Sequence, residues 1–160
     1  MEDYDFIRDD AVFGTLIYDL SWTGYRRESF CGKESRIALI VSGEESGTFE
    51  PGQYAAYQGL VERWEDLQRA VLSGILRYYC DLRQQLGYDK EPNDDYPGME
   101  TEQDLLPHIS LTGIHVPYEN MYGGRSIGLL FDCDWNEENG VGVRLRDEGI
   151  LEIGCQDIAL

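Results

Sequence analysis

Basic residues and long apolar runs are both scarce in this 160-residue sequence. Thirteen Lys and Arg residues stand against 31 Asp and Glu residues, which gives a formal net charge of −18. Nucleic acids and anionic membrane surfaces should repel such a chain, because binding to them depends on basic side chains that neutralise phosphate. No apolar run approaches the roughly 20 residues that span a bilayer, and residues 1–5 lack the features of a signal peptide. We therefore expect a cytoplasmic protein that binds neither nucleic acid nor membrane.

Catalytic and metal-binding motifs are also lacking. The four cysteines lie far apart and form no C-x-x-C pair, so we expect reduced thiols and no zinc site. His108 and His115 occupy no catalytic spacing, and each is expected to finish a strand rather than to act as a base. No glycine-rich phosphate-binding loop is present. The sequence thus predicts no cofactor, no metal and no catalytic residue.

The hydrophobic content and the pattern of apolar residues indicate one α+β domain over residues 1–160. Hydrophobic residues make up 42% of the chain and aromatic residues 12%, enough for a sizeable core. Alternating apolar and β-branched residues predict strands over 12–18, 25–31, 36–41, 109–116, 126–133, 140–146 and 150–155. A tight turn at Asp147-Glu148-Gly149 is expected between the last two. The predicted architecture is an antiparallel β-sheet of about six or seven strands with one long helix packed on a face.

Helical periodicity extends from Pro51 to about Leu86. Apolar residues recur there at steps of three and four, at Leu60, Trp64, Leu67, Val71, Ile75, Tyr78 and Leu82. A straight helix of this length would reach roughly 50 Å, so we expect a bend or break near Gly59 or Gly74. The opposite face mixes acidic and basic residues and is expected to be solvated. A polar loop follows, from Gly87 to Asp104.

The richest chemistry lies in the segment from Asp132 to Gly140, which holds Asp132, Asp134, Trp135, Glu137 and Glu138. Its D-x-D-x-N opening imitates a calcium loop, but Glu137 replaces the required glycine and Val143 replaces the final bidentate carboxylate. In an extended strand Asp132 and Asp134 share one face and Trp135 turns to the other. Two interpretations of Trp135 remain open: an exposed anchor for a protein partner, ringed by carboxylates, or a buried core residue.

The same segment carries a family resemblance. It resembles an uncharacterised bacterial domain family with a pattern close to C-x-W-D-x-E-H-G-x-G-V, followed by a strand and a v-G-x-x-D ending. The matching residues here are Cys133, Trp135, Glu138, Gly140, Gly142, Val143 and 153–157. Asn136 and Asn139 stand where the family tends to have Asp and His, and amides cannot shuttle protons at neutral pH. Similar small acidic domains occur among immunity proteins of bacterial toxin systems, so the resemblance implies a binding role.

Three functional hypotheses follow. The first is a non-enzymatic cytoplasmic immunity protein that binds and neutralises a basic toxin domain, with Asp132, Asp134, Trp135, Glu137 and Glu138 as the binding residues. The second is a carboxylate-based or metal-dependent enzyme that uses the four carboxylates of this segment. The third is a structural subunit of a larger assembly. We favour the first because the charge, the lack of catalytic motifs and the resemblance all point to it.

Overall fold

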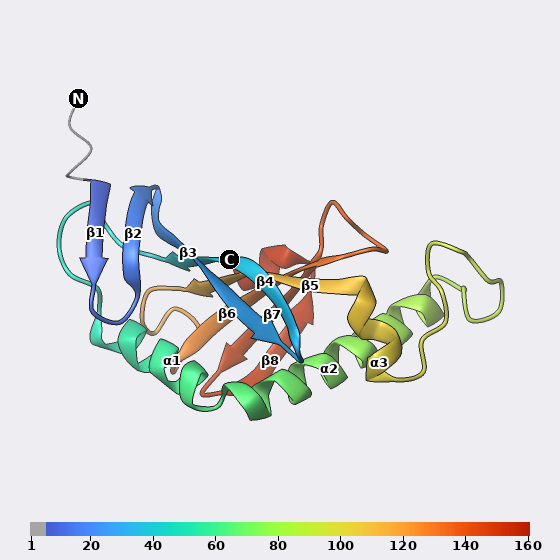
Figure 1. The fold of residues 1–160 in the computed structure, drawn as a ribbon. Coiled ribbons are helices and arrows are strands. Elements are labelled where there is room, and N and C mark those ends of the chain that lie inside the picture. The colour runs from blue at the N-terminus through green and yellow to red at the C-terminus, as the bar shows by residue number, and fades with distance from the viewer. Residues whose placement is uncertain (1–5) are drawn as a thin grey trace.

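The computed structural model describes residues 6–160, which form one eight-stranded sheet and three α-helices (Figure 1). The strands are β1 (Ile7–Asp10), β2 (Gly14–Asp19), β3 (Ser21–Phe30), β4 (Lys33–Val41), β5 (Ile109–Val116), β6 (Ser126–Cys133), β7 (Val141–Arg146) and β8 (Gly149–Gly154). The helices are α1 (Pro51–Glu62), α2 (Trp64–Gln85) and α3 (Glu102–Leu105), and two 3₁₀ turns are η2 (Leu106–His108) and η3 (Gln156–Ala159). The α+β class is confirmed, and the expected six or seven strands were too few.

The order of the strands in the sheet follows their order in the sequence, from β1 to β8. All neighbouring strands are antiparallel except β4 and β5, which run parallel from the pair Ala38–Gly113 to the pair Val41–Val116. The sheet is therefore mixed, and the expectation of a purely antiparallel sheet was wrong. The physical reason is the connection: α1 and α2 carry the chain across the sheet, and a long crossover is what allows neighbouring strands to run parallel.

The single long helix of the sequence prediction is divided into α1 and α2 at Arg63, whose backbone angles (φ −105°, ψ 11°) leave the helical range. The break does not fall at Gly59 or Gly74. A Cβ on Gly59 would come within 2.7 Å of the Glu148 carboxylate, and one on Gly74 within 2.9 Å of Ile153. Both glycines therefore let the helices approach the sheet closely. No helix in residues 6–160 is both long and apolar enough to cross a membrane.

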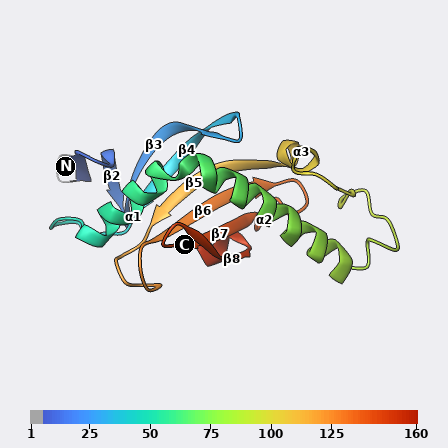
Figure 2. The same cartoon turned by 90° about the horizontal axis from the view of Figure 1, so that it is seen from below.

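Helices α1 and α2 cover one face of the sheet (Figure 2). Alternate side chains of the central strands point toward them, and Leu129, Phe131 and Val143 have no solvent exposure. Val71 and Ile75 of α2 are equally buried on the helical side. The core is therefore the layer between sheet and helices, as the apolar stripe of the sequence predicts.

The turn η3 covers the opposite face of β6 and β7. Gly128 lies beneath it, and a Cβ at this position would overlap the backbone carbonyl of Ala159. Two buried side chains hold η3 in place: Arg144 donates from Nε (3.3 Å) and Nη2 (3.2 Å) to the Ile158 carbonyl, and His115 Nδ1 lies 3.2 Å from the Ala159 carbonyl. The second face of the sheet thus has its own small, partly polar contact layer.

Candidate functional site

The carboxylates predicted as binding residues lie at the turn between β6 and β7. Asp132, Asp134, Glu137 and Glu138 are all exposed there. Trp135 instead points into the core: it is 7% exposed, and its ring centroid lies 4.5 Å from that of Tyr79 in α2. Of the two interpretations of Trp135, the structure therefore matches the buried one. Its indole supports the turn from beneath while the four carboxylates face solvent.

His108 joins this turn to the chain segment that precedes β5. The backbone N–H of Asp134 donates to the His108 carbonyl (3.1 Å), and the Asp134 carboxylate lies 2.9 Å from His108 Nδ1. His108 borders a hollow of about 340 Å³ with Asp132, Asp134 and Glu137, and a second of about 460 Å³ with Glu100 and Asp104. Sequence reasoning expected His108 only to finish a strand. In the folded chain it lies between two acidic segments.

The second acidic segment is the connection between α2 and β5. Seven exposed carboxylates lie in it, at Asp89, Glu91, Asp94, Asp95, Glu100, Glu102 and Asp104, with Lys90 as the only basic residue among them. Arg83 of α2 anchors this segment through two hydrogen bonds. Its Nε donates to the Tyr96 carbonyl (2.8 Å) and its Nη2 to the Tyr88 carbonyl (2.9 Å). We call the carboxylates of residues 89–104 and 132–138 the acidic end.

Local hydrogen bonds favour the charged form of one carboxylate of the acidic end, that of Asp104. The backbone N–H groups of Glu100 and Thr101 donate to the Asp104 carboxylate and lower the pKa of that group. Thr101 and Asp104 also form a capping box at the start of α3. The short helix that the sequence prediction missed therefore fixes one of the carboxylates near His108.

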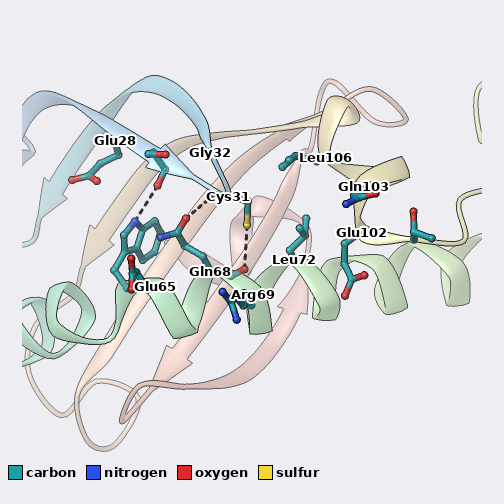
Figure 3. A pocket seen from close by; sticks show the side chains of 13 residues that line it. Glu28, Cys31, Gly32, Glu65, Gln68, Arg69, Leu72, Glu102, Gln103 and Leu106 are labelled. Carbon is teal, nitrogen blue, oxygen red and sulfur yellow. Dashed lines mark hydrogen bonds between the residues drawn. The ribbon is translucent and has the colours of Figure 1, made fainter.

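An open groove of about 1090 Å³ adjoins the acidic end (Figure 3). Its walls are the end of the β3–β4 hairpin, the first half of α2, and α3 with η2. Three glutamates from these three elements line it, at Glu28, Glu65 and Glu102, and Arg69 is its only basic residue. Glu65 and Arg69 belong to the helix face that the sequence led us to expect as simply solvated, and nothing in the sequence brings Glu28 or Glu102 next to them.

The next feature is the arrangement of metal-ligating side chains and the state of two cysteine thiols among the described residues. Within residues 6–160, no group of three or more His, Cys, Asp and Glu side chains is arranged to hold a metal ion. Burial raises the pKa of the Cys133 thiol to about 11, so this cysteine stays protonated and weakly nucleophilic at neutral pH. Burial also raises the pKa of Cys31 in the groove. The turn at residues 132–140 therefore presents exposed carboxylates above a buried, protonated thiol.

One polar contact that the sequence analysis did not foresee lies away from the acidic end. His115 Nε2 is 3.1 Å from Ser42 Oγ, and burial next to Arg144 lowers the pKa of His115 to about 4. Because Nδ1 faces a carbonyl, the neutral ring carries its proton there and Nε2 accepts from Ser42. Such a ring is a weak base at neutral pH, so we assign this contact to the structure of the sheet.

Residues 12–160 match the family model described as a domain of unknown function (DUF6985). No curated protein and no solved structure matches the chain. The match covers nearly the whole sequence, so the chain belongs to the DUF6985 family. The motif around Trp135 and the similarity to immunity proteins stay predictions from the sequence.

Proposed function

We propose that this member of the DUF6985 family is a non-enzymatic binding protein that recognises a basic protein partner through its acidic end. The observation that carries the proposal is the convergence at His108. Residues 89–104 and 132–138 each contribute carboxylates to a hollow that His108 borders, and two contacts between His108 and Asp134 hold the second segment in place. Like charges repel each other, so their concentration on one surface costs stability unless a cationic partner offsets it.

The most concrete form of the proposal is an immunity protein whose partner is a basic toxin domain, such as a nuclease. A strongly acidic surface would speed the encounter with such a domain and exclude acidic proteins, because complementary potentials act mainly on association rate and specificity. The lack of a metal-holding group among residues 6–160 is compatible with inhibition by direct contact. Carboxylates at a surface turn can also be substituted with little loss of stability, which suits recognition of one toxin among many.

The first test is whether a gene next to this one encodes a toxin with a basic domain, and the second is whether that purified domain binds this protein. We expect a complex at low salt whose dissociation constant rises steeply as salt is added. Replacing Glu137 and Glu138 together by Lys should weaken the complex by roughly tenfold or more. A matched control is Glu45→Lys, in the exposed loop between β4 and α1, which lies at the other end of the fold (Figure 1).

Two different outcomes would show that the proposed surface is wrong or that the proposed partner is wrong. If the lysine variant at Glu137 and Glu138 and the Glu45→Lys control weaken the complex equally per charge, net charge alone drives binding and the acidic end is not the surface. If the toxin domain does not bind at low salt, the immunity role is wrong. Thermal unfolding of each variant checks that the fold is retained.

A further inference from the structure

The groove beside the acidic end has an apolar floor between charged walls. Leu72, which is 8% exposed, and the half-buried Leu106 lie within it, and Trp64 borders it at the hairpin end. Figure 3 shows Glu28 and Glu65 at one end of the groove and Glu102 at the other. A surface of this kind favours a segment with both apolar and cationic side chains.

Hydrogen bonds fix two walls of the groove relative to each other. Trp64 Nε1 donates to the Ser29 carbonyl (3.0 Å), and Gln68 Oε1 accepts from the backbone N–H of Cys31 (2.6 Å). These contacts fasten the β3–β4 hairpin to α2 in the free protein. A preformed groove lowers the cost of binding, because little ordering of the receptor remains to be done.

None of the three glutamates forms an ion pair with a basic residue among residues 6–160. Glu102 accepts a hydrogen bond from the Ser73 hydroxyl (3.0 Å). The volume of the groove, about 1090 Å³, exceeds the roughly 300–1,000 Å³ usual for small-ligand sites, and the groove is open to solvent along its length. Its size and charge therefore fit a chain segment better than a small molecule.

We infer that this groove binds an extended segment of the basic partner in which Lys or Arg side chains alternate with apolar ones. The cations lie against Glu28 and Glu65 at one end and Glu102 at the other, and the apolar side chains pack on Leu72 and Trp64. This inference rests on the proposed function, because it names the part of the partner that docks next to the acidic end. It adds a second, partly apolar contact to a surface otherwise made of carboxylates.

The test uses the full-length protein and a synthetic peptide that alternates Lys and Leu. Trp64 reports on binding through its fluorescence, because Trp22 and Trp135 are buried. Peptides that alternate Gln with Leu, or Lys with Gln, should bind at least about tenfold more weakly, since each lacks one of the two contacts.

Two variants of the protein place the binding in the groove. Glu65 and Asp66 are both exposed in the first turn of α2, and only Glu65 lines the groove. Glu65→Lys and Asp66→Lys therefore change the net charge and the helix terminus equally. We expect Glu65→Lys to weaken the peptide roughly tenfold and Asp66→Lys less than about threefold.

Three results would overturn the inference: no binding of the Lys–Leu peptide at low salt, equal binding of the Lys–Gln peptide, or equal weakening by the two lysine variants. Affinity of the protein variants for the toxin domain distinguishes this failure from a failure of the proposed function. A toxin complex that is weakened at Glu137 and Glu138 but unchanged by Glu65→Lys would leave the acidic end as the binding surface and remove the groove from it.

Discussion

Lowering the pH from about 7 to about 5 should destabilise the protein through His115, which is buried between the sheet and η3. Burial, and then the positive charge of Arg144, lower the pKa of His115 to about 4 in the folded chain. In the unfolded chain the ring titrates near its ordinary value of about 6.5. The unfolded state therefore takes up a proton first as the pH falls, and the stability that the neutral ring provides is complete above about pH 6.5 and lost progressively toward pH 4.

The size of the effect follows from the two pKa values. A difference of about 2.5 pKa units corresponds to about 3 kcal/mol in total, of which about 2 kcal/mol should be lost by pH 5. No carboxylate of residues 6–160 accepts a hydrogen bond from the ring. Its partners are Ser42 Oγ and the Ala159 carbonyl, and both can accept from a protonated ring. The cost of protonation is therefore that of a buried positive charge beside Arg144.

Urea denaturation of the wild type and of His115→Gln, each at about pH 7 and about pH 5, measures this contribution. All other ionisable groups are the same in the two proteins and cancel in the comparison, so the wild type should lose about 2 kcal/mol more than the variant. An equal loss in the two proteins would refute the reasoning, because it would mean that His115 takes up its proton in the folded state as readily as in the unfolded state.

Two substitutions test the packing on either side of the sheet. Gly128→Ala should lower the free energy of unfolding, measured by urea titration, by about 1–3 kcal/mol, because the new methyl group overlaps the Ala159 carbonyl. Gly149→Ala is the control: its nearest atom is 3.6 Å away, so the same titration should show a loss of less than about 1 kcal/mol. Trp135→Leu should cost about 2–4 kcal/mol through lost contact with Tyr79, and leave affinity for the toxin domain unchanged. Weaker toxin binding by a Trp135 variant of unchanged stability would show that the indole contacts the partner.

Local patterns predicted most of the secondary structure. The apolar stripe of α2, the strands of the C-terminal half and the turn at Asp147 and Glu148 all follow from short-range periodicity and turn chemistry, and both turn residues have positive φ values, as a tight hairpin requires. Strand β1 was missed because Ile7-Arg8-Asp9-Asp10 has no apolar alternation. It exists because it pairs with β2 and because the Asp10 carboxylate accepts the N–H groups of Val12 and Phe13 at the turn.

The errors concerned contacts between distant segments. Gly59 and Gly74 look like helix breakers along the chain, and their real role depends on Glu148 and Ile153, which face them across the core. The carboxylates of the proposed binding surface are visible in the sequence as two separate clusters. Their convergence at His108 depends on the path of the sheet, and no spacing along the chain records it.

The parallel pair of β4 and β5 also determines how the chain can fold. Strands β1–β4 and β5–β8 each form antiparallel neighbours from adjacent parts of the sequence, and β4–β5 is the single ladder of the described sheet that joins distant parts. Short loops close at low entropic cost, whereas a long loop must close before its contacts provide any stabilisation. We therefore expect formation of the four pairs from Ala38–Gly113 to Val41–Val116 to limit the folding rate. φ-value analysis at Leu39 would measure whether this ladder is formed in the transition state.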